Sequence, residues 1–358
     1  MVYSFESEED KIPVLTEGQN WILASLFNLV VVADSLQQAM RCQELVRLVT
    51  EKFPCRVFLI QIDETSESDF FHTEHTVQAI GSRAAKVCYD QITIESSPSQ
   101  IRKAPFVILP KILPDLPVYI LLGHDLAQDD ALLPELQKFA TRIVFDSQSL
   151  DNIQRFADHM LSTIQTAHND FVDINWAKTK AWREVMARAF DTPEKQALIS
   201  QSKMIQISYC CPSAHAKSKL ELQSLYLQAW LAAQLGWHFL QVEKEDGTYR
   251  VQYQSDKRPL EISIIPRDTQ ALEMGEVFSI EVLTHDDTHY LITHEGKLGQ
   301  VTVHASSNER CEMPYTLFLN SYQKGTALIN EILYQPPSEH YVAMLGMLNH
   351  PQWKALTI

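Results

Sequence analysis

The period of the hydrophobic pattern changes near the middle of this chain, and the change divides the fold into two parts. The first half alternates short, continuous apolar runs with segments whose apolar residues recur every three or four positions. Such runs are typical of strands buried on both faces of a parallel sheet, and the wider spacing is typical of helices. Most strand candidates of the second half alternate apolar and polar residues, as in sheets with one solvent-facing side. We therefore expect two different sheets in succession.

Residues 1–170 are predicted to form an open, mostly parallel, Rossmann-like α/β domain with helices. Residues 28–34, 35–53 and 55–62 predict a strand, a helix and a second strand, and together they make a βαβ unit. Pro54 ends the helix between them. Further strands are expected over 85–94, 118–122 and 142–145, and further helices over 131–140 and 150–166.

Residues 171–358 are predicted to form an α+β domain, an antiparallel meander with flanking helices. Thr192 and Pro193 have the order of an N-cap and a first-turn proline, and Gly236 follows a helical pattern as a C-cap glycine would. The expected helices cover 178–190, 218–235, 315–333 and 339–348. The expected strands cover 204–209, 237–243, 249–254, 260–265, 277–283, 290–293 and 300–304.

Glycine is scarce, at 10 of 358 residues, where a usual share is about 7%. Loops that hold phosphate groups need glycine because backbone N–H groups must come close to the anion. The turn after the first predicted strand, Asp34–Ser35, contains none, and neither GxGxxG nor GxxxxGK[ST] occurs in the chain. We therefore expect no bound dinucleotide and no other cofactor.

The formal net charge of −15 repels phosphate backbones and anionic lipid, so we expect no nucleic-acid partner and no membrane partner. The first ten residues are acidic, unlike a signal peptide, and the apolar stretches reach only about five residues, far short of a membrane span. A cytoplasmic protein with reduced thiols is expected, because the six cysteines include no CxxC pair. Cys210 and Cys211 are neighbours, which leaves a structural and a redox role open.

Polar residues follow three predicted strands of the first domain, where an open α/β sheet binds ligands. A ligand crevice is one interpretation of this pattern, and helix capping by Ser35, Asp125 and Ser147 is the other. The candidate crevice residues are Asp34, Ser35, His124, Asp125, Asp146 and Ser147.

Histidines and aspartates gather at residues 285–289, with His294 close behind. Two consecutive aspartates between alternating runs are also typical of an ordinary turn, and His285, His289 and His294 straddle a strand rather than converge. We predict no metal site here. No GxSxG motif occurs, and no serine, cysteine or lysine has a recognisable activating neighbour, so we predict no catalytic residue.

One segment of this acidic chain combines two tryptophans with four basic residues within 173–190. Tryptophan and arginine are the residues that dominate binding energy at protein interfaces, whereas tryptophan at helical spacing is also typical of a core. The segment therefore predicts either partner binding or packing. The candidate partner-binding residues are Trp176, Lys178, Lys180, Trp182, Arg183 and Arg188.

The chain resembles the glucose-6-phosphate dehydrogenase assembly protein (OpcA) family. The resemblance lies in landmarks that occur in the family's order, and the segment from Asp173 to Asp191, with Trp176, Trp182 and Arg183, is the most specific of them. The other landmarks are residues 28–32, 53–60, 88–95, 109–118, 142–147 and 227–237.

This resemblance implies a non-catalytic partner that promotes assembly or activation of glucose-6-phosphate dehydrogenase, the enzyme that opens the oxidative pentose phosphate pathway. The alternative from another class is an enzyme or sensor that binds a sugar phosphate in the crevice near Asp34, His124 and Asp146.

Overall fold

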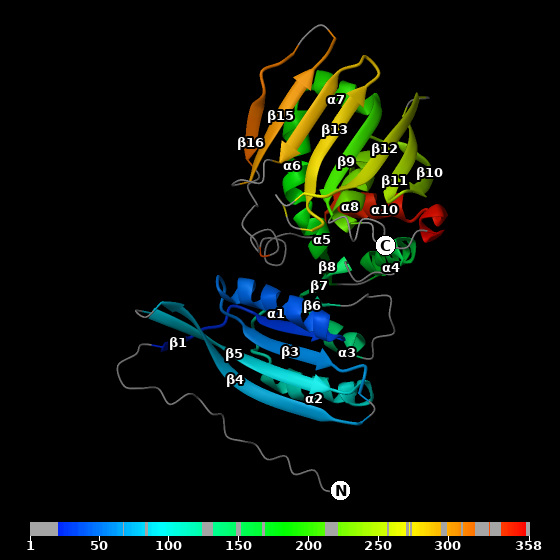
Figure 1. Ribbon diagram of the computed structural model, residues 1–358. Helices are drawn as coiled ribbons and strands as arrows, with labels where there is room; N and C mark the ends of the chain where they lie inside the picture. Colours follow the sequence, from blue (N-terminus) through cyan, green and yellow to red (C-terminus); the bar gives the residue numbers. More distant parts are fainter. Residues whose placement is uncertain are drawn as a thin grey trace, which may run out of the picture. The chain divides into compact units, whose positions relative to one another are not determined.

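The computed structural model describes residues 21–66, 68–82, 85–123, 132–147, 152–166, 169–211, 221–255, 258–269, 272, 274–294, 299–308, 311–318, 329 and 338–355. The chain separates into two compact units, residues 1–149 with 168–172 and residues 150–167 with 173–358 (Figure 1). The domain boundary after residue 170 stays a prediction.

The first unit is built on a mixed, mostly parallel sheet, as expected. Its strand order is β1-β5-β3-β2-β6-β7-β8, and β4 pairs with β5 in antiparallel orientation. The central strand β2 is fully buried and lies parallel to both β3 and β6. The bounds are β1 (Trp21–Leu23), β2 (Asn28–Ala33), β3 (Arg56–Ile62), β4 (Phe71–Ser82), β5 (Ala85–Ser96), β6 (Val118–Leu122), β7 (Arg142–Phe145) and β8 (Asp170–Asp173).

The helices of the first unit are α1 (Leu36–Thr50), α2 (Ala104–Ile108) and α3 (Leu133–Gln137). Short 3₁₀ turns at 98–103 and 109–111 flank α2. The βαβ unit β2–α1–β3 confirms the prediction for residues 28–62. The hairpin strand β4 was not predicted, because its polar residues His72, Thr73 and Glu74 are exposed and carry no apolar alternation.

The second unit contains an eight-stranded sheet of order β10-β11-β12-β9-β13-β14-β15-β16. The expected antiparallel meander is interrupted: β9 lies between β12 and β13, parallel to β12 and antiparallel to β13. Two meanders therefore flank β9. The bounds are β9 (Ser202–Cys210), β10 (His238–Glu245), β11 (Thr248–Ser255), β12 (Arg258–Arg267), β13 (Val277–Thr284), β14 (His289–His294), β15 (Gln300–Ser306) and β16 (Tyr315–Phe318).

Helices pack against one face of this sheet, where fully buried side chains such as Ile207, Tyr253 and Ile280 alternate along the strands. The helix α8 contacts β9 and β12, and α7 contacts β13. Figure 1 shows α6 and α7 behind the strands β13 and β15. The bounds are α4 (Ile153–Thr166), α5 (Ile174–Lys178), α6 (Lys180–Ala189), α7 (Pro193–Ser200), α8 (Leu222–Gln234) and α10 (Glu339–Leu348), followed by a 3₁₀ turn over 351–355.

Local signals placed two helix ends correctly. Thr192 caps α7 by accepting a hydrogen bond from the backbone N–H of Lys195, and Gly236 after α8 has a positive φ of 65°. The helix predicted over 315–333 is wrong at its start, because Tyr315–Phe318 pairs with β15 as the edge strand β16. Residues 319–328 lie outside the described part of the chain. Among the described helices, none is long and apolar enough to cross a membrane.

Candidate functional site

The carboxyl ends of β2, β6 and β7 lie at one edge of the first sheet, as the sequence predicts for a ligand crevice. Ser35 is the N-cap of α1, and its hydroxyl accepts from the backbone N–H of Gln38 at 3.3 Å. The Gln38 side chain in turn accepts from the backbone N–H of Asp34 at 3.1 Å. The backbone N–H groups of this turn that a phosphate would bind are therefore partly engaged by side chains at the start of α1. His124 and Asp125 lie outside the described residues.

Side chains of α1 also fill the space beside this turn. The space that a water molecule could enter measures about 10 Å³, which is room for a single water at most. A Cβ on Gly123 would lie 3.3 Å from both Cys42 Sγ and Gln38 Oε1, so the backbone just after β6 is already in close contact with side chains of α1. The lining residues are Gln38, Cys42, Leu45, Leu121, Leu122, Gly123 and Asp146.

Asp146 and Ser147 follow β7 at the same edge. The backbone N–H of Asp146 donates to the carbonyl of Leu122 at 3.1 Å, which extends the pairing of β6 and β7. Ser147 is buried, with 1% of its surface exposed. The described candidate residues therefore lie at the same edge of the sheet, and the described part of that edge does not enclose a ligand-sized space. A ligand crevice at this edge stays a prediction.

The segment with tryptophans and basic residues forms α5 and α6. Asp173 begins α5, and its side chain accepts from the backbone N–H of Asn175 at 2.8 Å. Trp176 and Trp182 are buried, at 4% and 6% exposure. Trp176 packs on the buried ring of Tyr341, with 5.5 Å between the ring centroids. The tryptophans therefore belong to the core of the second unit.

The basic residues of this segment divide into two groups. Lys178 and Arg188 are exposed, and Lys180 is half-buried. Arg183 is also half-buried, and its Nε donates to Thr179 Oγ1 at 3.1 Å between the two helices. Lys178 and Arg188 are the exposed charges of this segment, and the Arg183 guanidinium is engaged with the α5–α6 junction, so a docking role of the segment rests mainly on Lys178 and Arg188.

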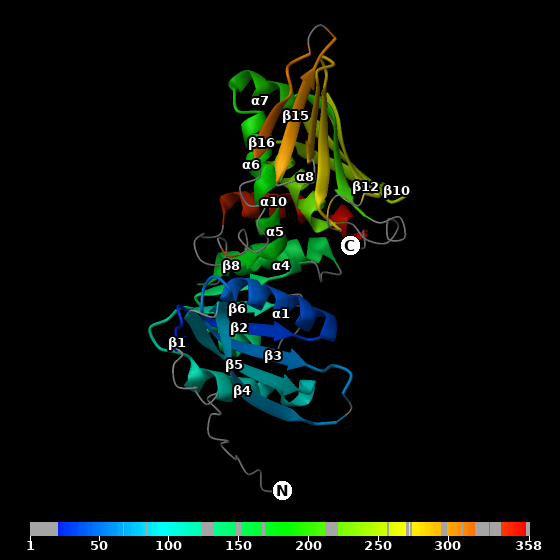
Figure 2. The ribbon, with the colours of Figure 1, turned by 60° about the vertical axis from the view of Figure 1, so that its left-hand side comes forward.

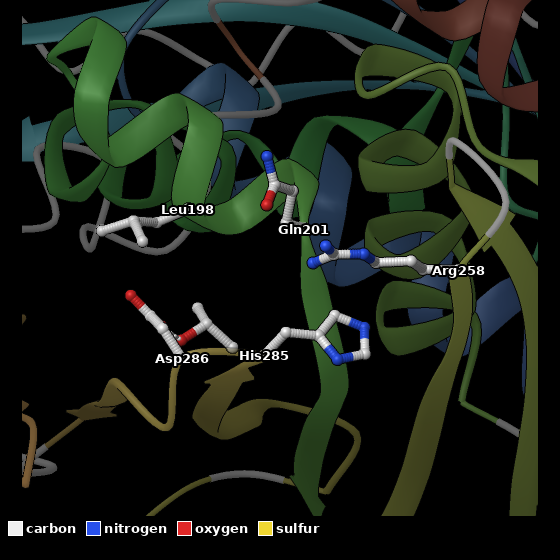
Figure 3. A pocket seen from close by; sticks show the side chains of 6 residues that line it. Leu198, Gln201, Arg258, His285 and Asp286 are labelled. Carbon is white, nitrogen blue, oxygen red and sulfur yellow. Dashed lines mark hydrogen bonds between the residues drawn. The ribbon is translucent and has the colours of Figure 1, made fainter.

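A hollow of about 180 Å³, which the sequence did not predict, lies at one end of the second sheet. Figure 3 shows Arg258 and His285 on one side of it and Asp286 on the other. A hydrogen bond from the Thr284 hydroxyl lowers the pKa of the Asp286 carboxyl below its ordinary value. The lining residues are Leu198, Gln201, Arg258, Thr284, His285 and Asp286. The sequence drew attention to His285 and Asp286, but the other lining residues come from separate elements, so no local pattern indicates that the six residues lie together.

The histidine cluster does not converge. His289 and His294 lie at opposite ends of the six-residue strand β14, about 17 Å apart at the usual rise per residue. Asp287 has a positive φ of 59°, which marks an ordinary turn. Within the described residues, no three histidine, cysteine, aspartate or glutamate side chains are grouped closely enough to hold a metal ion.

All six cysteines are free thiols, and Cys311 is exposed whereas the other five are buried. The Cys210 Sγ lies 3.0 Å from the carbonyl oxygen of Thr269. Burial raises the pKa of the Cys210 and Cys211 thiols, so both are protonated at neutral pH. Their surroundings favour the structural interpretation of this pair over the redox one.

Two family models match the chain in succession. Residues 46–162 match a model described as the glucose-6-phosphate dehydrogenase subunit N-terminal domain, and residues 169–325 match the corresponding C-terminal domain. The chain belongs to the OpcA family. The resemblance seen in the sequence is thereby confirmed.

Curated relatives carry the name OxPP cycle protein OpcA. The relative from Synechocystis is 24% identical over 204 residues, with 55% of this chain and 41% of the relative covered. The relative from Synechococcus elongatus is 22% identical over 263 residues, with 70% of this chain and 56% of the relative covered. The chain thus spans about half the length of the curated relatives that it matches.

The solved structures that the chain resembles include oxidoreductases. A 3-ketoreductase from Actinomadura kijaniata gives a TM-score of 0.49 at 10% identity, with 90% of this chain and 96% of that chain covered. Biliverdin reductase from Synechocystis gives 0.48 at 8% identity, with 91% and 98% covered. A likeness at this level carries no information on activity.

Proposed function

We propose that this chain is a non-catalytic, cytoplasmic partner of glucose-6-phosphate dehydrogenase that promotes assembly or activation of the enzyme in the oxidative pentose phosphate pathway. The observation that carries the proposal is the match of two family models in order, over residues 46–162 and 169–325, each described as a domain of a glucose-6-phosphate dehydrogenase subunit. The names of the curated relatives, which refer to the same pathway, support it.

The geometry of the first unit favours a partner over an enzyme. An enzyme with this fold would bind a dinucleotide or a sugar phosphate at the carboxyl ends of β2 and β6. In the described residues the space there is about 10 Å³, and the backbone N–H groups of Asp34 and Gln38 are already bonded to the Gln38 and Ser35 side chains. Opening the site would require displacing Gln38 and Cys42 from the backbone of Gly123.

The direct experiment is co-purification of the chain with the dehydrogenase of the same organism, followed by an activity assay with and without the chain. A stable complex with raised activity is expected. The purified chain alone is expected to reduce no NADP with glucose 6-phosphate. Turnover by the chain alone, or calorimetric binding of sugar phosphates and NADP to it, would instead favour the sugar-phosphate enzyme or sensor.

The docking surface is proposed to include the exposed basic residues of α5 and α6. Charge at the rim of an interface mainly sets the association rate and its dependence on salt. Lys178→Glu and Arg188→Glu are therefore expected to slow association with immobilised dehydrogenase, and less so at high salt. Lys203→Glu, an exposed lysine at the start of β9, is the matched control. Equal rates for all three variants would place the docking surface elsewhere.

A further inference from the structure

The hollow at the end of the second sheet lies where α7 meets the strands β12 and β13. Figure 2 shows α7 at the upper end of this unit. Ser255, which pairs with Arg258 at the start of β12, donates from its hydroxyl to the carbonyl of Ser200 at 2.7 Å. Ser202, which begins β9 directly after α7, pairs with Thr284 at the end of β13. These contacts hold the end of α7 against both strands, so the walls of the hollow have a fixed backbone.

Three polar side chains line this hollow without a partner among the described residues. The guanidinium of Arg258, the imidazole of His285 and the side-chain amide of Gln201 make no hydrogen bond or ion pair there. All three are exposed, so a ligand can reach them from solvent. Each can donate N–H groups, and the planar fork of a guanidinium matches the two oxygens of a carboxylate. This side of the hollow therefore suits a carboxylate.

The opposite side of the hollow carries a negative charge that is held in place. The carboxylate of Asp286 accepts hydrogen bonds from the hydroxyl of Thr284 and from the backbone N–H of Thr288, the latter at 3.3 Å. The bond from Thr284 lowers the pKa of Asp286, so this group is ionised at neutral pH. Figure 3 shows Asp286 across the hollow from Arg258, and the two side chains make no ion pair with each other. Opposite charges therefore face the same space from two sides.

We propose that this hollow binds a free α-amino acid, with its carboxylate toward Arg258 and His285 and its ammonium group toward Asp286. An α-amino acid carries both of these charges on one small framework, and Leu198 offers an apolar contact for its side chain. A single water molecule needs about 10–15 Å³ of accessible space, so a hollow of about 180 Å³ has room for a ligand of this size.

Charge favours a zwitterion over a small anion or cation. The net charge of −15 on the chain repels an anion, and Asp286 adds to that repulsion beside the hollow. A cation would instead meet the guanidinium of Arg258. An amino acid carries no net charge at neutral pH, so the field of the chain does not oppose its entry. This ligand class does not depend on the proposed function.

The test is calorimetric titration of the purified chain with L-leucine, L-glutamine and glycine, which share the two charges and differ in side chain. Two relatives of L-leucine separate the charges, since 4-methylpentanoate lacks the ammonium group and 3-methylbutylamine lacks the carboxylate. Binding of at least one amino acid is expected. If L-leucine binds, both relatives should bind about tenfold or more weakly, because a hydrogen bond to a charged group contributes at least that factor.

Variants locate the binding in the hollow. Arg258→Gln and Asp286→Asn each remove one charge and should weaken amino-acid binding by about tenfold or more. Both residues are exposed, so we expect the variants to fold, and their melting temperatures check this. Arg267→Gln is the matched control, because it removes the same charge from an exposed residue at the other end of β12 and should leave the affinity unchanged.

Three results would overturn the proposal. The first is the absence of binding for all three amino acids. The second is binding that survives both Arg258→Gln and Asp286→Asn, which would place the amino acid elsewhere on the chain. The third is tighter binding of inorganic phosphate than of any amino acid, lost in Arg258→Gln, which would assign the hollow to anions. Because no dehydrogenase is present in these samples, none of the three results bears on the proposed function.

Discussion

The guanidinium of Arg183 lies over the ring of Trp176, with 3.6 Å between its Cζ and the ring centroid. Its Nη2 also donates to the carbonyl of Trp176 at 3.4 Å. Because Trp176 is on α5 and Arg183 is on α6, these contacts hold the two short helices in a fixed orientation. The tryptophan and the arginine that the sequence offers as interface anchors are thus engaged with each other.

Arg183→Ala is expected to lower the free energy of unfolding by about 1–2 kcal/mol, since it removes a cation–π contact and hydrogen bonds at a half-buried site. Arg188→Ala, at an exposed position of the same helix, is expected to change it by less than about 0.5 kcal/mol. Denaturant unfolding of both variants measures the difference. Equal losses of stability in the two variants would show that the stacking of Arg183 on Trp176 does not stabilise the fold.

Local patterns predicted most elements because the apolar residues of core helices and core strands recur at different, recognisable spacings in the sequence. The run 28–33 and the alternation along β12 and β13 are examples. The sheet order could not be predicted in the same way: β9 pairs with strands that follow it by more than fifty residues, and no local signal selects a neighbour at that distance. The edge strands β4 and β16 were not predicted, because residues exposed on an edge strand need not alternate between apolar and polar.

For the candidate sites, too, the sequence predicts position along the fold but not the packing that decides what the site can do. The edge of the first sheet could be located from the strand ends, since topology brings carboxyl ends of parallel strands together. Its closure could not, because it depends on how Gln38 and Cys42 pack against Gly123. Likewise, the pattern of α6 leaves core and interface roles open for Trp182, and only the packing decides between them.

Thiol reactivity offers a prediction from burial. Cys311 is exposed, and the other five thiols are buried, with burial raising the pKa of Cys55, Cys210 and Cys211. Since the thiolate is the reactive form, one thiol per native chain should react rapidly with iodoacetamide at pH 7. Mass spectrometry of the labelled chain identifies it. In denaturant all six thiols should react. Rapid labelling of Cys210 or Cys211 in the native chain would instead favour a redox role for this pair.

The pH dependence of stability should include a contribution from His294. Burial lowers the pKa of this imidazole below 6.5, because the charged form is poorly solvated at 3% exposure. The unfolded chain therefore binds the proton first, and stability is lost as the pH falls from about 6.5 through the folded pKa. Unfolding curves at pH 7 and pH 5 should differ less for His294→Leu than for the unchanged chain. His304→Leu, an exposed histidine on β15, should keep the original difference.

Two glycines with open space around them should respond to alanine with opposite signs. A Cβ would meet nothing within 4 Å at either Gly236 or Gly346, so a clash with neighbouring atoms does not decide how alanine changes the stability. Gly236 follows α8 with a φ of 65°, a conformation that costs an L-residue about 1 kcal/mol, so Gly236→Ala should destabilise the chain by about that amount. Gly346 lies inside α10, where alanine is favoured over glycine by about 0.5–1 kcal/mol. Gly346→Ala should therefore raise the melting temperature while Gly236→Ala lowers it. A change of the same sign in both variants would mean that backbone conformation does not control stability at these helix positions.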